Sequence, residues 1–450
     1  MMVRAMFNRI LIVFIITVFM TGCEVKSREE APQVVAWAEN ASLYEVNIRQ
    51  YTPEGTFEAF GRHLPRLKEL GVDVLWFMPI TPISEKNRKG TLGSYYAVKD
   101  YRGINPEYGT LEDFKAVVNE AHRLGFKVMI DWVANHTGWD NWLIEAHPDW
   151  YTQRDGHIVS PVEDWSDVAD LNYDNREMRR YMIESLLYWV KEADIDGFRC
   201  DMAGMVPTDF WEEAREALDS VKPVFMLAEA WEPDLTRKAF DACYGWDLHH
   251  LMNDLAQRKK DGTVLPGYFA KVDSQYTKRT IVLNFIDNHD ENSWSGSVPE
   301  RMGEAAPVYA VMAYTVPGMP LLYSGQEAGL NKRLPFFEKD SIDWNVRPEL
   351  AGFYRKLNDL KRGCPALKAG EHGGTFRILP QDNERHVFAY ERKLGEQQVV
   401  VVLNLTGEEQ RSVLAEEITG PFTEYFSGAT AGALKEFTLP ANGYRVFVSR

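Results

Sequence analysis

The sequence predicts an α/β fold in which eight parallel strands close into a (β/α)8 TIM barrel, followed by a C-terminal antiparallel β-sandwich domain. Short apolar, β-rich runs alternate along the chain with amphipathic helical stretches. Polar and charged residues gather where those runs end, as they do at the C-terminal face of such barrels. After about residue 365 the pattern changes to strands and turns. A doubly wound open sheet is the alternative, but no Gly-x-Gly-x-x-Gly turn follows the first run.

Helices are expected between most pairs of barrel strands. An amphipathic helix spans 56–70 and closes at Gly71, and another begins at Thr110 in a capping-box pattern and ends at Gly125. A long helix covers about 175–193. The barrel strands themselves are expected at 43–48, 72–80, 126–133, 195–201, 224–228, around Tyr244, 281–286 and 319–323.

Two regions depart from the strand–helix repeat. Residues 137–174 are too long for an ordinary connection and are rich in Trp, Asp and Pro, which predicts a small domain inserted on the barrel's C-terminal rim. The barrel is then expected over 41–364 and the β domain over 365–450. Strands of the β domain are expected at 386–392, 399–405, 437–439 and 444–448.

The N-terminus has the pattern of an export signal. In residues 1–22, two arginines precede an apolar run that is shorter than a membrane-spanning helix. The run ends Met20-Thr21-Gly22-Cys23, which resembles the lipobox of bacterial lipoproteins, although Met20 stands where Leu is usual. The resemblance implies lipidation of Cys23 and a membrane-anchored protein in the outer membrane, cell surface or periplasm, with 23–40 as a polar tether. A plain signal peptide or an uncleaved anchor is the alternative.

Composition excludes some classes of partner. The formal net charge is −16, so the chain lacks the basic surplus that binding to a phosphate backbone requires, and no nucleic acid partner is expected. Thirteen Trp and twenty Tyr suit flat, hydroxylated ligands such as sugars. Apart from Cys23, the widely spaced Cys200, Cys243 and Cys364 predict neither a disulfide framework nor a metal site.

The run Ile-Asp-Gly-Phe-Arg-Cys-Asp at 195–201 ends in two charged residues. Side chains two apart in a strand point the same way, so Arg199 and Asp201 share a face. A cation beside a carboxylate keeps it ionised, which is what a carboxylate nucleophile requires. An ordinary ion pair at a strand end is the alternative.

Other runs also end in residues that can carry chemistry. The third is followed by Asp-Trp-Val-Ala-Asn-His at 131–136, the fifth by Glu229, and the seventh by Phe-Ile-Asp-Asn-His-Asp at 285–290. Three acids, Asp201, Glu229 and Asp290, would therefore face one barrel mouth. Because like charges in proximity are costly, this arrangement indicates a catalytic site.

These stretches, in this order, resemble the conserved regions of glycoside hydrolase family 13, the α-amylase family. Supporting matches are the segments at 95–101 and 169–172, and the resemblance extends from about residue 42 to the end. It implies that Asp201 is the nucleophile, Glu229 the general acid/base and Asp290 the carboxylate that holds sugar hydroxyls. The remaining implied roles are orientation of Asp201 by Arg199, hydrogen bonds to the sugar from His136 and His289, and stacking beneath it by Tyr96.

The implied reaction is retaining hydrolysis of α-1,4-glucosidic bonds in starch, glycogen or maltodextrins. Many α-amylases carry Lys and His three and four positions after the nucleophile, where this chain has Gly204 and Met205. Asn135 and Asp170 match other calcium-site positions of the family, and their oxygens suit Ca²⁺. Alternatively, Asn135 only fixes its loop.

Two alternatives to α-amylase activity stay open. Within the family, neopullulanase- or cyclomaltodextrinase-like enzymes, oligo-α-glucosidases and transglycosylases differ mainly in their rim loops. In another class, the transporter-associated heavy chains are similar non-catalytic proteins that lack the three acids. The presence of all three acids in this chain counts against a purely glucan-binding or transporter-associated role.

Overall fold

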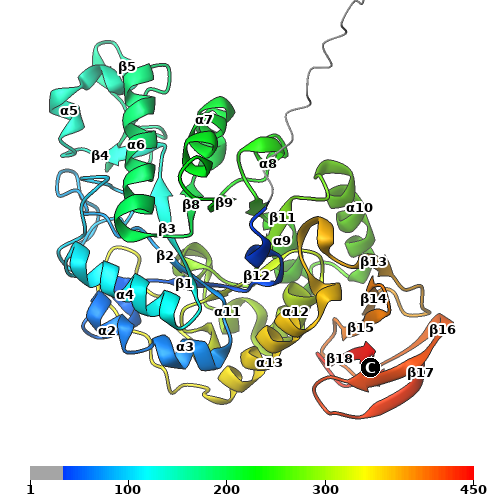
Figure 1. Cartoon of the computed structure of the whole chain (residues 1–450). Helices are drawn as coiled ribbons and strands as arrows, with labels where there is room; N and C mark the ends of the chain where they lie inside the picture. Colours follow the sequence, from blue (N-terminus) through cyan, green and yellow to red (C-terminus); the bar gives the residue numbers. More distant parts are fainter. Residues whose placement is uncertain (1–33, 450) are drawn as a thin grey trace, which may run out of the picture. The chain divides into compact units, whose positions relative to one another are not determined.

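A computed structural model describes residues 34–449 (Figure 1). Within that range, eight parallel strands close into a barrel, so the predicted barrel is confirmed and the open sheet is excluded. The strands pair in the order β1-β12-β11-β10-β9-β8-β3-β2. They are β1 Leu43–Val46, β2 Val74–Phe77, β3 Lys127–Val133, β8 Gly197–Asp201, β9 Phe225–Ala228, β10 Ala242–Tyr244, β11 Ile281–Asn284 and β12 Met319–Tyr323.

The barrel strands are apolar on both faces because both faces are buried. Alternate side chains fill the interior of the barrel, among them Leu43, Val74, Trp76, Met129, Phe225, Leu227 and Leu283. The intervening side chains pack against the surrounding helices. This division explains why the runs read as continuous hydrophobic segments in the sequence.

Helices surround the barrel, with two departures from the predicted boundaries. The expected helix at 56–70 is broken at Arg62 and His63, because Pro65 lacks an N–H and starts a new helix in its first turn. The capping box at Thr110 is confirmed, since Thr110 and Asp113 exchange side chain-to-backbone hydrogen bonds. The main helices are α2 Phe57–Gly61, α3 Leu64–Leu70, α4 Leu111–Arg123, α6 Arg176–Ala193, α7 Thr208–Asp219, α8 Leu235–Lys238, α9 Trp246–Ala256, α10 Leu265–Gln275, α11 Val298–Met302, α12 Ala306–Thr315 and α13 Glu349–Gly363.

The segment between β3 and α6, where the sequence predicts an inserted rim domain, holds short strands and helices whose buried residues join the main core. Its two ends are joined by the antiparallel strands β4 (His136–Gly138) and β7 (Val168–Asp170). Between them lie α5 (Leu143–Ala146) and the hairpin β5–β6, over Gln153–Arg154 and His157–Ile158. Because β4 begins where β3 ends, this unit stands directly beside the barrel mouth.

The C-terminal strands form an antiparallel domain. They are joined in one hydrogen-bonded sheet, whereas a sandwich would hold two. One face, with Tyr390, Val401 and Leu403, shares a core with α12 of the barrel. The opposite face builds a core of its own around Val402 and Phe422. The strands are β13 Thr375–Ile378, β14 Val387–Leu394, β15 Gln397–Asn404, β16 Gln410–Glu424, β17 Thr430–Leu439 and β18 Tyr444–Ser449.

The predicted tether over 23–40 is wrong for its last residues. Residues 36–40 form the 3-10 helix η1, in which Ala38 is fully buried. The Trp37 ring packs 5.5 Å from that of Phe225, so apolar side chains cover the N-terminal end of the barrel core. Residues 1–22 and Cys23 lie outside the described residues. No helix within 34–449 has the length and apolar character needed to cross a membrane.

Candidate active site

Arg199 lies at the centre of the polar cluster in the barrel mouth. Its side chain is fully buried, and Nη1 lies 2.9 Å from both Asp131 Oδ1 and Asp201 Oδ1. Nη2 lies 3.0 Å from Glu229 Oε1, an ion pair rather than a well-aligned hydrogen bond. The register of the sheet explains this convergence, since β3 and β8 place Asp131 opposite Arg199. Arg199 therefore contacts three carboxyl groups from three strands.

A second cation, His289, holds another part of the cluster. Its Nδ1 hydrogen bonds Glu45, and its Nε2 lies 2.8 Å from the Tyr96 hydroxyl and 3.2 Å from Asp290 Oδ2. Although burial opposes the charged form, Asp290 and Glu45 raise the pKa of His289 well above its usual value. The protonated ring thus donates from both nitrogens. The Tyr96 hydroxyl donates in turn to Asp131 Oδ2 over 3.0 Å.

The charges of the cluster do not balance if every acid is ionised. Five carboxyls, those of Glu45, Asp131, Asp201, Glu229 and Asp290, face two buried cations. Burial is the main cause that raises the pKa of Glu229 to about 7, and the charges of Asp201 and Asp290 add to it. Burial and the charge of Asp131 raise the pKa of Asp201 to about 6 despite Arg199. For Asp290, burial is outweighed by His289 and Arg199, which lower its pKa. The acids are therefore poised in different protonation states.

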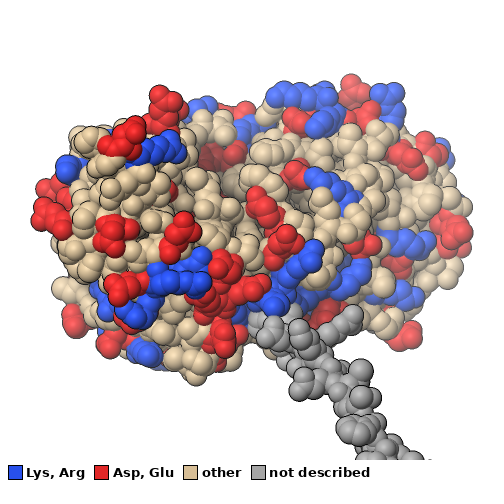
Figure 2. Space-filling model, turned by 90° about the horizontal axis from the view of Figure 1, so that it is seen from above, with Lys and Arg blue, Asp and Glu red and all other residues tan. Residues whose placement is uncertain are grey.

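Six of the seven predicted catalytic and substrate-binding residues line one cleft of about 400 Å³: Tyr96, His136, Asp201, Glu229, His289 and Asp290. Arg199, the seventh, lies buried beside them. Tyr96 stacks on the Phe336 ring, with centroids 6.2 Å apart, which gives the cleft an aromatic side. Burial lowers the pKa of His136 to about 4, so this ring is neutral and can hydrogen bond a hydroxyl. On the face shown in Figure 2, acidic and basic side chains of the described residues are interspersed.

Several residues of the site were not predicted from the sequence. Glu45 and Asp131 are part of the polar cluster, and both are acids inside or next to apolar runs, a signal that the sequence does carry. Tyr244 accepts from Arg199 Nε over 3.2 Å. Trp294 and Phe336 also line the cleft, Trp294 from the π-helical turn η5 (Glu291–Ser295) and Phe336 from a loop.

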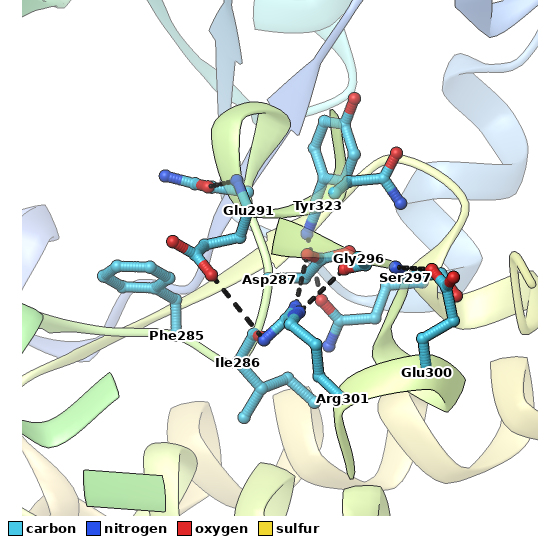
Figure 3. Close-up of polar contacts among 12 residues, drawn as sticks. Phe285, Ile286, Asp287, Glu291, Gly296, Ser297, Glu300, Arg301 and Tyr323 are labelled. Atoms are coloured by element: carbon cyan, nitrogen blue, oxygen red, sulfur yellow. Dashed lines mark hydrogen bonds and ion pairs between the residues drawn. The ribbon is translucent and has the colours of Figure 1, made fainter. Parts of the chain in front are cut away.

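A buried arginine fixes the loop that carries His289 and Asp290 (Figure 3). Arg301, in α11, donates to the carbonyl of Ile286 over 2.8 Å and to that of Gly296 over 2.7 Å. It also pairs with Asp287 Oδ1 over 2.7 Å, and its Nη1 donates to Asn253 over 2.9 Å. One guanidinium therefore ties both ends of the 286–296 loop together.

Asn135 and Asp170, the predicted calcium positions, come close to each other through the β4–β7 pairing. His136 lies opposite Asp170, and the Asn135 carbonyl accepts from Leu171 N over 3.1 Å. Burial raises the pKa of Asp170, whose neighbours include Thr152. Among residues 34–449 no group of three or more His, Cys, Asp or Glu side chains could hold a metal ion. One amide, one carboxylate and nearby carbonyls fit an oxygen-binding cation such as Ca²⁺.

Comparison with known families agrees with this architecture. A family model described as the α-amylase catalytic domain matches residues 36–375, and one described as the maltogenic amylase C-terminal domain matches 376–446. The chain belongs to glycoside hydrolase family 13. The motifs at the ends of β3, β8, β9 and β11 are therefore its family 13 motifs.

Solved structures of similar proteins share this family 13 fold. A noncanonic maltogenic α-amylase AmyB from Thermotoga neapolitana has a TM-score of 0.84 and 30% identity, covering 91% of this chain and 99% of that one. An α-amylase from Lactobacillus plantarum has a TM-score of 0.83 and 30% identity, covering 92% and 99%. A curated relative, α-amylase MalA of Haloarcula japonica, is 28% identical over 92% of this chain. The chain spans 62% of the length of that relative and of a maltogenic α-amylase from Bacillus acidopullulyticus.

This family 13 chain has Gly204 three positions after Asp201, and the carboxylate of Glu232 lies beside it. A Cβ on Gly204 would lie 3.0–3.2 Å from the carboxylate of Glu232. Glu232 Oε2 also accepts from the Trp231 N–H over 3.1 Å. The acid beside Gly204 is an exposed side chain, which can therefore move.

Proposed function

We propose that the protein is a retaining glycoside hydrolase that cleaves α-1,4-glucosidic bonds in linear maltodextrins. The observation that supports this most is the contact of Asp201 and Glu229 with adjacent nitrogens of one guanidinium. Two carboxyl groups held by one guanidinium are close together. Such a distance fits the separation of about 5–5.5 Å between the two catalytic carboxyls of retaining enzymes better than the separation of about 6.5–9.5 Å in inverting ones. Burial raises the pKa of Glu229 to about 7, which suits a general acid that must hold a proton near neutral pH, and the guanidinium of Arg199 favours the ionised form of Asp201.

In the first step, ionised Asp201 attacks the anomeric carbon while protonated Glu229 gives its proton to the departing glycosidic oxygen. Arg199 keeps the Asp201 oxygens oriented and stabilises their charge until the covalent bond forms. Asp290, His136 and the His289 ring would bind sugar hydroxyls around the reacting centre.

In the second step, Glu229 is ionised and takes a proton from a water molecule that attacks the glycosyl ester of Asp201. The ester breaks, Asp201 regains its charge, and the sugar leaves with the configuration it had in the substrate. Two displacements on one carbon thus give net retention.

The preference for maltodextrins rests on the relatives. Their names include maltogenic α-amylase, cyclomaltodextrinase and neopullulanase as well as α-amylase. The C-terminal domain is of the maltogenic amylase type. Both points favour short α-glucans over intact starch as the substrate.

The test compares hydrolysis of starch, pullulan and maltotriose by the wild type and by Asp201→Asn. The amide cannot attack, so turnover should fall by at least about 10⁴-fold, the scale on which a catalytic unit fails when one member is lost. Glu145→Gln, which changes an exposed acid in α5, is the control and should keep full activity. An inactive wild type would favour the non-catalytic glucan-binding alternative.

The two-step mechanism has its own test in Glu229→Ala with an activated aryl glycoside. That leaving group needs no proton, so a glycosyl-enzyme should accumulate on Asp201, and added azide should release an α-glycosyl azide. A β-configured azide product would contradict retention.

We also propose that Ca²⁺ binds at Asn135 and Asp170 and stabilises the junction of β4 and β7. Calcium would supply charge compensation for the Asp170 carboxylate there. For the N-terminus, we propose that Cys23 is lipidated and holds the exported protein at a membrane.

A further inference from the structure

A continuous wall closes one side of the cleft, and we define it by three segments: 84–93, 164–167 and 335–339. Lys89, in the first segment, donates from Nζ to the carbonyl of Asp164 over 2.7 Å. The same Nζ lies 3.1 Å from Oδ1 of Asp167, whose residue is only 5% exposed. Lys89, Asp164 and Asp167 all line the cleft. This latch joins the loop after β2 to the inserted rim unit.

The other end of segment 84–93 is fixed to segment 335–339. The Leu92 N–H donates to the Phe337 carbonyl over 3.0 Å, and the Thr91 N–H donates to Glu338 Oε1 over 3.0 Å. Gly90 has φ of +63°, and a Cβ there would lie 2.4 Å from that of Phe337, so the two segments pack in direct contact.

The wall is also supported by a buried arginine in the short helix after β1, α1 (Ile48–Tyr51). The guanidinium of Arg49, which is almost fully buried, donates to the carbonyls of Gly93 and Leu92 over 3.1 and 3.2 Å. A segment held by backbone bonds on one side, an ion pair on the other and a buried arginine below is expected to be rigid.

Barrel order shows on which side of the reacting bond the wall stands. Segments 84–93 and 335–339 follow β2 and β12, the two neighbours of β1, and segment 164–167 lies in the rim unit after β3, which pairs with β2. In the circle of eight strands, β1 lies opposite β9. Glu229, at the end of β9, protonates the departing sugar, so the leaving group departs on the side away from the wall. Trp231 is 61% exposed on that open side. The sugar chain retained on Asp201 must then extend toward the wall.

We propose that this wall limits the retained part of the substrate to a short chain end, so the enzyme acts from non-reducing ends, and that the Lys89 latch sets this limit. The inference rests on the proposed function and narrows its substrates to α-glucans with a free non-reducing end. Interior bonds of a long chain, blocked ends and cyclic glucans would place sugar where segments 84–93 and 164–167 meet.

The experiment compares two aryl α-maltoheptaosides, one with a free and one with a blocked non-reducing end, together with β-cyclodextrin. The wild type should cleave the free-ended substrate at least about tenfold faster than the blocked one and should not open the ring, because a steric wall discriminates by at least this factor. Equal rates on both aryl substrates would overturn the inference and leave the proposed function intact. Failure on every α-glucan would instead reject the proposed function.

Lys89→Ala tests the latch. The ratio of the blocked to the free-ended rate should rise about tenfold, since loss of the ion pair frees the two segments. Lys86→Ala, at an exposed position of the same segment that does not line the cleft, should leave the ratio unchanged. An unchanged ratio in Lys89→Ala with a wild-type melting temperature would reject Lys89 as the specificity determinant. The wild-type ratio needs no variant and stands as a test even if Lys89→Ala does not fold.

Discussion

Glu229 and Asp201 must be in opposite protonation states when the glycosidic bond breaks. Arg199 contacts both, but burial and neighbouring acids raise both pKa values, to about 7 and about 6 respectively. One guanidinium cannot neutralise three acids that lie within 3 Å of it. The excess of carboxyl groups over cations therefore favours the protonated form of Glu229 near neutral pH, which is the form that a general acid needs.

This charge arrangement predicts a narrow pH profile. As pH rises through about 7, Glu229 loses the proton that it must donate, and kcat/KM should fall. As pH drops through about 6, Asp201 gains a proton and ceases to be a nucleophile, so kcat/KM should fall there as well. Initial rates on maltotriose across about pH 4–9 would measure both the acidic and the basic decline in kcat/KM, because this range extends beyond both pKa values. A kcat/KM that stays constant from about pH 5 to 9 would contradict the roles of Glu229 as the acid and Asp201 as the nucleophile.

At the scale of elements, Arg301 holds the segment between β11 and α11, which includes the π-helical turn η5 (Glu291–Ser295). Loops are ordinarily the mobile parts of a barrel rim. Here a buried guanidinium connects the carbonyls of Ile286 and Gly296, so His289 and Asp290 lie on a segment that is fixed at both ends.

We expect Arg301→Lys to reduce kcat about 10–100-fold, because a displacement of about 1 Å at a reacting group costs this much. Lysine keeps the charge beside Asp287 but cannot reach both carbonyls. Arg333→Lys changes an exposed ion pair with Glu300 nearby and is the matched control. A purely structural role would instead lower the melting temperature and leave kcat per folded molecule unchanged.

The proposed calcium site lies at the junction of β4 and β7. If Asn135 and Asp170 hold Ca²⁺, chelation should lower the melting temperature, since a ligand at 100 times its Kd stabilises the folded state by about 2.7 kcal/mol. The double change Asn135→Ala and Asp170→Asn should abolish this dependence. Identical melting curves in chelator and in excess calcium would show that the two residues only fix the loop.

At the scale of the whole molecule, the barrel and the C-terminal sheet share a core. Tyr390 of β14 is fully buried, and its hydroxyl hydrogen bonds Thr315 of α12. Arg392 Nη1 also donates to the Thr315 carbonyl over 3.3 Å. Because these contacts are buried and specific, the two parts are expected to unfold together.

Tyr390→Ala should therefore destabilise the barrel as well as the sheet, by about 3–5 kcal/mol for loss of a buried aromatic side chain. All thirteen Trp precede residue 375, so their fluorescence reports the barrel alone. In Tyr390→Ala, the midpoint of the fluorescence change on heating should fall by the same amount as the midpoint of the calorimetric transition. Tyr390→Phe removes only a hydrogen bond and should cost about 0.5–1.5 kcal/mol. A separate low-temperature transition without a fluorescence change would contradict a shared core.

The proposed membrane anchor rests on Cys23, which lies outside the described residues. Cys23→Ser should remove the acyl acceptor and move the protein from the membrane to the soluble fraction, measured by fractionation and by mass analysis of the N-terminus. An unchanged distribution, with no acyl group on the native N-terminus, would favour a plain signal or an uncleaved anchor.

Much of the architecture was determined by the sequence itself. Buried strands are apolar on both faces, so each barrel strand appears in the sequence as a short apolar run. The acidic residues at the ends of these runs led to the prediction of Asp201, Glu229 and Asp290 as site residues. Helix boundaries were predicted less well, since Pro65 starts a second helix inside the single helix expected at 56–70. The end of the predicted N-terminal tether was also wrong, because Trp37 and Ala38 pack against the barrel core. Short polar segments carry no periodicity that distinguishes packed from solvated chain.

Only the tertiary structure decided how loops and distant acids combine. Glu45 pairs with His289, 244 positions away, and Thr91 with Glu338, 247 positions away. Such pairs arise when the barrel closes and brings β1 beside β12, because contact across the mouth depends on strand order and not on spacing along the chain. Arg301 and Lys89 act through backbone carbonyls and a neighbouring loop, and a carbonyl has the same chemistry at every position. The residues proposed to carry the reaction could therefore be found in the sequence, whereas those proposed to position and limit it became visible only in the tertiary structure.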